Sequence, residues 1–158
     1  MFEPAELRKL ICQTLTPIDE LYSPESLELL MATCAQESHL GTYRQQVGGP
    51  ALGIFQMEPA TWNDIWANYL VYHTALAAEV KALQQIPSLG AREMITNDPL
   101  AIAMARVHYL RVPEPLPAMT DLAGLWRYYK AHYNTPQGAA TQDEFFANYK
   151  RLVGGPAM

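Results

Sequence analysis

A single glutamate, Glu37, stands where a carboxyl group could carry out acid–base chemistry. It follows an apolar helical run that contains Met31 and Cys34, so it is expected at the buried end of a helix. Burial beside such side chains removes water and disfavours the ionised carboxylate. A glutamate that stays protonated near neutral pH can act as a general acid. The alternative is an ordinary glutamate in the last turn of a solvated helix.

A second stretch that could bind a ligand follows Glu37 at short range. It reads Gly53, Ile54, Phe55 and Gln56, with Pro59 shortly after. Gln56 can donate and accept hydrogen bonds to a sugar hydroxyl or amide, and Gly53 lets the backbone approach a ring. The alternative is that Gly53 only serves a turn.

Four short motifs, taken in order, resemble those of the soluble lytic transglycosylases and goose-type lysozymes. The resemblance extends over residues 24–150, nearly the whole chain. The motifs are Glu37-Ser38, the run from Gly53 to Pro59, Asn97-Asp98-Pro99 with Tyr109-Leu110 downstream, and Tyr133-Asn134. The resemblance implies an enzyme that cleaves peptidoglycan with Glu37 as its acid and then its base. It implies seven substrate-binding residues: Ser38, Gly53, Phe55, Gln56, Tyr109, Tyr133 and Asn134.

The resemblance also implies details of the reaction. The hydroxyl of Tyr133 is expected to point toward Glu37. In lytic transglycosylases the C6 hydroxyl of the sugar attacks and gives a 1,6-anhydro product, which we expect here, whereas in goose-type lysozymes water attacks. Glu58 and Asp64 are candidates for a second carboxylate, but an acidic residue at a helix start is favoured by the helix dipole in any case. We expect no cofactor, and no Cys/His spacing indicates a metal site.

The chain departs from the family pattern at three places. No serine occurs in residues 47–52, Arg106 stands where a glycine is usual, and Thr135 and Pro136 follow Tyr133-Asn134. The missing serine and glycine favour an alternative, a phage virion structural or wall-binding protein that keeps the fold and has lost turnover. The four histidines lie outside the family pattern and are interpreted as loop, packing or surface residues.

Composition limits the classes of partner. The 158 residues are 49% hydrophobic and carry a formal net charge of −5. This hydrophobic content argues against disorder, and the acidic balance argues against a nucleic-acid partner. No segment approaches the ~20 apolar residues of a membrane span. We expect a monomer that binds peptidoglycan glycan strands, with phage virion proteins as further partners.

The N-terminus lacks the basic start and apolar run of a signal peptide. The expected place of synthesis is therefore the cytoplasm of a bacterial host. Periplasmic peptidoglycan would be reached by a virion component or by an endolysin released through a holin.

Apolar periodicity and turn residues predict an all-α, lysozyme-like single domain over residues 1–158, with about six helices and at most a small β-hairpin. Residues 41–58 are predicted as a loop, with a weak strand signal at 52–57. The apolar face of the longest predicted helix is expected to pack within the molecule, a coiled-coil seam being the alternative. Cys12 and Cys34 are expected to be reduced, a disulfide being the alternative. The predicted helices are 4–15, 24–37, 60–86, 98–110, 121–133 and 141–153.

Overall fold

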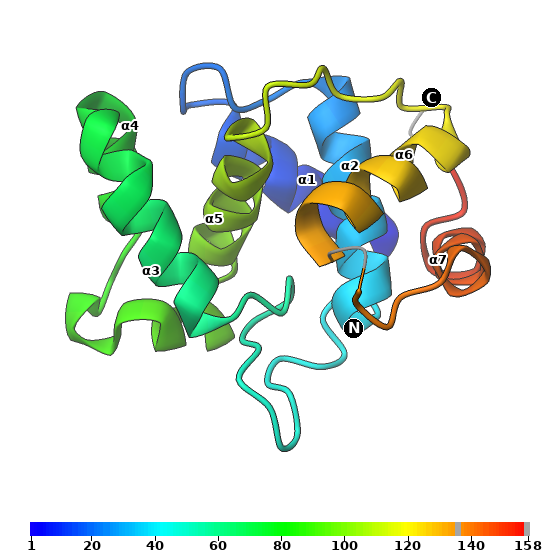
Figure 1. Ribbon diagram of the computed structural model, residues 1–158, viewed down its shortest axis with the longest axis horizontal. Coiled ribbons are helices and arrows are strands. Elements are labelled where there is room, and N and C mark those ends of the chain that lie inside the picture. The colour runs from blue at the N-terminus through cyan, green and yellow to red at the C-terminus, as the bar shows by residue number, and fades with distance from the viewer. Residues whose placement is uncertain (135–136, 157–158) are drawn as a thin grey trace.

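A computed structural model describes residues 1–134 and 137–156, and it confirms the predicted mainly α-helical fold class. Over these residues the chain forms seven α-helices and no extended strand (Figure 1). None of the described helices is both long and apolar enough to cross a membrane. The α-helices are α1 (Pro4–Leu15), α2 (Pro24–Ser38), α3 (Pro59–Asn68), α4 (Thr74–Lys81), α5 (Asp98–Leu110), α6 (Leu122–Tyr129) and α7 (Gln142–Asn148). The 3₁₀ segments are η1 (Leu70–Tyr72) and η2 (Pro87–Ile95), and the π-helical turns are η3 (Lys130–Asn134) and η4 (Tyr149–Val153).

The helix that ends in Glu37 forms as the sequence predicts. Ser23 and Ser26 cap its first turn reciprocally, each hydroxyl accepting a hydrogen bond from the other's backbone N–H. Pro24 fits this first turn because its missing N–H would have no helical partner there. The helix ends where His39 adopts a left-handed conformation with φ of 51°. Glu37 is therefore the penultimate residue of α2.

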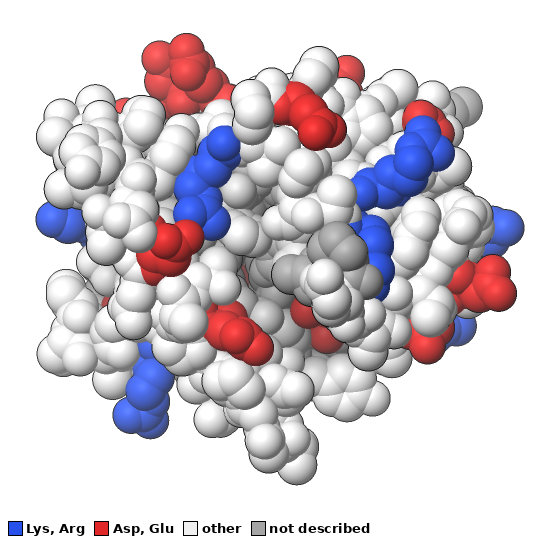
Figure 2. Space-filling model, viewed as in Figure 1, with Lys and Arg blue, Asp and Glu red and all other residues white. Residues whose placement is uncertain are grey.

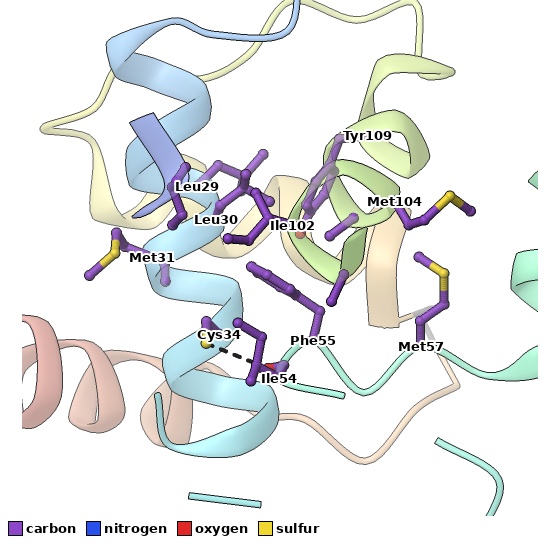
Figure 3. Close-up of a cluster of buried hydrophobic side chains, with 14 of the residues drawn as sticks. Leu29, Leu30, Met31, Cys34, Ile54, Phe55, Met57, Ile102, Met104 and Tyr109 are labelled. Carbon is purple, nitrogen blue, oxygen red and sulfur yellow. Dashed lines mark hydrogen bonds between the residues drawn. The ribbon is translucent and has the colours of Figure 1, made fainter. Parts of the chain in front are cut away.

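The loop after α2 is held by buried side chains, and it supplies one wall of the site described below. Phe55 lies between α2 and α5, and Ile54 lies beside Cys34 of α2 (Figure 3). The thiol of Cys34 is 3.5 Å from the carbonyl oxygen of Ile54. Both cysteines are free thiols, as predicted. Where the sequence weakly predicted a strand over 52–57, the structure has two isolated antiparallel bridges, Gln45 with Leu52 and Leu52 with Met57.

The prediction of a single long helix over 60–86 is wrong, because the chain forms α3, η1 and α4 instead. Residues 69–73 are aromatic, β-branched or leucine, and aromatic and β-branched side chains lose rotamer freedom in a helix. The backbone leaves helical geometry at Tyr69, whose ring then stacks on His73 with centroids 4.0 Å apart. The break buries Leu70 completely. Trp62 and Val80 also belong to the common core, as the intramolecular interpretation requires.

α5 begins at the predicted residue. Asn97 caps it, because its amide oxygen accepts a hydrogen bond from the N–H of Leu100 at 3.1 Å. Asp98 forms an ion pair with Arg44, at 2.6 and 3.0 Å. This pair fastens the loop after α2 to the first turn of α5.

Candidate active site

Glu37 opens onto a cleft of about 390 Å³ between the end of α2, the loop before α3, α5 and η3. Five of the residues considered in the sequence analysis line this cleft, although they come from segments far apart in the chain. They are Glu37, Gln56, Glu58, Tyr133 and Asn134. Three polar side chains and two apolar ones complete the wall. The residues that line the cleft are Glu37, Gln46, Ala51, Gln56, Met57, Glu58, Thr61, His108, Tyr133 and Asn134.

The carboxyl group of Glu37 has the properties of a general acid. Its side chain is partly buried in the last turn of α2. Burial raises the pKa of Glu37 to about 7, although a hydrogen bond from Tyr129 opposes the rise. The carboxyl group is therefore substantially protonated at neutral pH, which a solvated glutamate is not.

Tyr129, rather than Tyr133, contacts the candidate acid. The Tyr129 hydroxyl donates a hydrogen bond to Oε2 of Glu37. Burial, followed by the nearby Glu37, raises the pKa of Tyr129 far above its ordinary value, so the phenol keeps its proton and remains a donor. The hydroxyl of Tyr133 donates instead to the carbonyl oxygen of Phe55, at 2.6 Å. The Tyr133 hydroxyl is therefore bonded to the loop and not to Glu37, although burial and then the nearby Glu37 charge raise the pKa of Tyr133.

The two tyrosines lie on one helical face and form one stack. Their ring centroids are 5.9 Å apart with planes at 20°. α6 ends at Tyr129 and continues as the π-helical turn η3, where Lys130 holds Asn134 in the cleft. The ammonium group of Lys130 donates to the Asn134 side-chain oxygen at 2.8 Å, and also to the carbonyls of Gly138 and Ala140. Asn134 is thus oriented by its own helical turn.

Gly53 and Gln56 form a tight turn that brings the loop against η2. Gly53 has φ of +76°, and a Cβ there would lie 2.5 Å from the backbone oxygen of Met94. No larger residue fits this position without moving one of the two segments. Gln56 also has positive φ, at 48°, and its side-chain amide donates to the Gly53 oxygen at 2.9 Å. This bond fixes the Gln56 side chain along the cleft wall.

Four of the predicted substrate-binding residues do not line the cleft: Gly53, which lies against Met94 of η2, and Ser38, Phe55 and Tyr109. Ser38 is completely buried, donates to the Ile54 carbonyl at 2.6 Å and accepts from the Gly41 N–H at 2.8 Å. Phe55 is 1% exposed within the core. Tyr109 is equally buried, and its hydroxyl is 2.8 Å from that of Thr33. The side chains of Ser38, Phe55 and Tyr109 are buried in the packing around α2 and do not line the cleft.

The two candidate second carboxylates are in different situations. Glu58 is exposed, lines the cleft, and makes no side-chain hydrogen bond to the helix that it precedes. Asp64 is absent from the cleft wall and accepts hydrogen bonds from Arg111 and Asn68, each at 2.7 Å. Glu58 is therefore the second carboxyl group that can meet a ligand bound beside Glu37.

Among the residues of this site that sequence reasoning missed, Tyr129 and His108 have the most to do with its chemistry. Tyr129 precedes Tyr133 by four residues, so helical spacing alone puts both rings on one face. His108 immediately precedes Tyr109 in the third motif, and its ring packs edge-on against Tyr133 with centroids 5.0 Å apart. Arg106, at the position of the usual glycine, is buried and donates to the Leu21 carbonyl at 2.7 Å.

Over residues 1–134 and 137–156, no group of three or more histidine, cysteine, aspartate or glutamate side chains could hold a metal ion. No protein-family model matches the chain, and neither a curated protein nor a solved structure is significantly similar to it.

Proposed function

We propose that this protein is a peptidoglycan lytic transglycosylase. It cleaves the β-1,4 bond between N-acetylmuramic acid and N-acetylglucosamine, with Glu37 as general acid and then general base. The observation that carries the proposal is the state of Glu37 itself. Its carboxyl group faces an open cleft, and burial raises its pKa to about 7. A protonated carboxyl group in such a cleft is what a glycosidic leaving oxygen requires.

The described contacts support one order of events. Glu37 donates its proton to the glycosidic oxygen, the bond to the sugar breaks, and positive charge develops at the anomeric carbon. The Glu37 carboxylate that results is stabilised by the hydrogen bond from Tyr129. It then accepts the proton of the C6 hydroxyl of the same sugar as that oxygen attacks the anomeric carbon. The product is a 1,6-anhydro sugar, and Glu37 regains its proton.

The remaining cleft residues suit a chain of N-acetylated sugars. Gln56 and Asn134 offer side-chain amides, which can donate to and accept from hydroxyl and acetamido groups. Each is already held by one internal hydrogen bond, to Gly53 and from Lys130 respectively. A preset amide loses less conformational entropy when it binds a sugar than a free one would.

Hydrolysis to a reducing end is the second candidate, and Glu58 is the observation that favours it. Its carboxylate lines the same cleft and is free of helix-capping bonds. A retaining glycosidase needs a second carboxyl group about 5–5.5 Å from the acid, and an inverting one needs about 6.5–9.5 Å. We place hydrolysis second because Glu58 is exposed and no described hydrogen bond holds it at either distance.

The proposal extends to delivery by a phage, as a virion component or as an endolysin released by a holin. On the face shown in Figure 2, basic side chains are interspersed with acidic ones rather than gathered into a basic patch. The net charge of −5 gives no long-range attraction to an anionic wall. Delivery by a larger assembly would remove the need for such attraction. A wall-binding virion protein without turnover is the alternative within this proposal.

Digestion of purified Gram-negative sacculi tests the activity and the product together. The digest is reduced with borohydride and examined by mass spectrometry. Anhydro sugars resist reduction and are lighter than the hydrolysis product by one water. A digest of anhydromuropeptides supports the proposal, and a digest made wholly of reducible ends identifies a lysozyme. A carboxylic general acid would operate between about pH 4 and pH 8. If no soluble muropeptides were released at any pH in this range, the transglycosylase proposal would fail and the wall-binding alternative would stand.

A further inference from the structure

His108 lies in the cleft, but the reaction described above does not use it. The residue is on α5, where its neighbour Tyr109 is buried in the core while His108 remains partly exposed. Its ring contacts the edge of Tyr133 and shares the cleft wall with Glu37 and Gln56. The imidazole is therefore in a position to meet the same ligand as the candidate acid.

One nitrogen of this imidazole is already committed. The Arg111 guanidinium approaches Nδ1 of His108 at 2.7 Å, and it also donates to Asp64 at 2.7 Å. Asp64 in turn accepts a hydrogen bond from Asn68 at 2.7 Å. A guanidinium carries only donors, so Nδ1 must be the acceptor of this contact. A neutral imidazole whose Nδ1 accepts carries its proton on Nε2.

The surroundings keep the ring neutral. Burial and the adjacent Arg111 lower the pKa of His108 to about 4, with His132 acting in the same direction and Asp64 against it. The ring is consequently uncharged over the range in which Glu37 titrates. A charged imidazolium in the cleft would favour the Glu37 carboxylate and would weaken the acid, and a neutral ring avoids this effect.

The second nitrogen of the ring is available to a ligand. Nε2 makes no hydrogen bond to any described residue and is absent from the buried polar atoms that lack a partner. His108 contributes to the cleft wall, where this nitrogen can meet a ligand. The arrangement presents one fixed N–H donor of no net charge beside the candidate acid.

We propose that His108 is a sugar-binding residue whose Nε2–H donates to a neutral oxygen of the glycan, and that Arg111 and Asp64 are positioning residues that fix its tautomer. The oxygen belongs to a hydroxyl or to an acetamido carbonyl, since both accept without carrying charge. This inference rests on the proposed function, because it assumes that the cleft binds a chain of N-acetylated sugars.

The first test needs no ligand. Long-range proton–nitrogen NMR of the full chain, with the His108 signals assigned from a His108→Gln variant, reports which nitrogen carries the proton. We expect the proton on Nε2, no protonation of the ring above about pH 5 in keeping with its lowered pKa, and a mixture of tautomers in Arg111→Met. A proton on Nδ1, or a ring that titrates near its ordinary value, would overturn the inference.

The second test measures binding of tetra-N-acetylchitotetraose by calorimetry in a Glu37→Gln background. His108→Phe keeps an aromatic ring and removes the donor, so the dissociation constant should rise about three- to tenfold, the size of one neutral hydrogen bond. His108→Gln keeps a donor and should lose less affinity. His73→Phe, which changes an exposed histidine outside the cleft, is the matched control and should bind as the parent does.

The outcomes separate this inference from the proposed function. Equal binding by His108→Phe and the Glu37→Gln parent would overturn the role of His108 and leave the glycan cleft standing. No binding of the tetrasaccharide by the parent would overturn the glycan cleft, and the role of His108 with it.

Discussion

At the scale of single residues, the proposed chemistry depends on two opposing effects on one carboxyl group. Burial favours the neutral form of Glu37, and the Tyr129 hydroxyl favours the ionised form. Burial is the larger effect, so the pKa of Glu37 rises to about 7. A general acid works best when its pKa lies near the working pH, because it must give up its proton and regain it in each cycle.

Replacing Tyr129 by phenylalanine should weaken only one of these effects. Without the hydroxyl, nothing opposes burial, and the pKa of Glu37 should rise further above its wild-type value. The reaction needs protonated Glu37, so activity is lost as the pH rises through that pKa. The alkaline limb of the profile of muropeptide release should therefore move to higher pH in Tyr129→Phe.

Tyr133→Phe is the matched control, because it removes a hydroxyl of the same stack that bonds to the Phe55 carbonyl. It should leave the alkaline limb in place and lower the free energy of unfolding by about 1–3 kcal/mol, since a buried acceptor loses its donor. If both variants moved the limb equally, or Tyr129→Phe moved it to lower pH, the assigned contact would be wrong.

At the scale of elements, the site depends on how closely the loop after α2 approaches its neighbours. Gly53 touches η2, Ser38 bonds to the Ile54 carbonyl, and Arg44 pairs with Asp98 at the start of α5. These contacts hold Gln56 opposite Glu37. Loops that carry functional side chains need such support from rigid elements.

Gly53→Ala should show how much this close approach matters. The new methyl group would meet the backbone oxygen of Met94 at 2.5 Å, and the positive φ adds strain. Overpacking of this kind costs about 1–3 kcal/mol, and the left-handed conformation adds about 1–2 kcal/mol. Urea unfolding should reveal the sum, together with reduced muropeptide release.

Gly48→Ala supplies the control for Gly53→Ala. It has a similar φ of +71° in the same loop, but open space surrounds it. It should show the conformational cost alone and keep its activity. Equal destabilisation by the two variants would mean that contact with η2 does not set the position of this turn.

Sequence patterns predicted the elements well where local signals are strong. The proline and serine at the start of α2, together with its apolar run, predicted both the helix and the place of Glu37. The break at Tyr69 was missed because the apolar spacing of four and three residues fits two shorter helices as well as one long one. Breaking the helix gains burial of Leu70, which is a tertiary effect.

The candidate site was predictable only in part, for a related reason. Motif order led to Glu37, Gln56, Tyr133 and Asn134, and these residues line one cleft. It gave no way to tell which tyrosine would contact the acid, because that depends on the turn from α6 into η3. Motif order also singled out Ser38, whose hydroxyl bonds to the backbone of the loop. Packing decides whether a polar side chain contacts a ligand or the backbone, and motif order does not report packing.

At the scale of the whole molecule, a buried ion-pair cluster and the proposed catalytic residue lie toward opposite ends of α2. Glu28, near the start of the helix, is 1% exposed and pairs with Arg8 of α1 at 2.5 Å. It also accepts a hydrogen bond from Tyr149 of η4 at 2.5 Å. Glu37 lies nine positions after Glu28, a rise of about 13.5 Å along a helix. This buried cluster therefore joins both ends of the chain to α2 away from the cleft.

Glu28→Ala should consequently separate folding from activity. Removing one partner of a buried ion pair leaves Arg8 uncompensated, which typically costs about 3–5 kcal/mol. The melting temperature should fall sharply, while muropeptide release per folded molecule, measured well below that temperature, should be unchanged. Glu6→Ala removes an exposed carboxylate of α1 and should be far less destabilising. Loss of specific activity in folded Glu28→Ala would contradict this division of roles.

The central claim is that Glu37 is the acid, and one substitution tests it most directly. Glu37→Gln keeps the shape of the side chain and removes the proton. The measurement is the initial rate of muropeptide release from purified sacculi, compared with wild-type protein, with thermal melting of both chains alongside. We predict a rate lower by about 10²–10⁴-fold, the usual size of a general acid–base contribution, with no fall in melting temperature. A near wild-type rate in folded Glu37→Gln would contradict the claim.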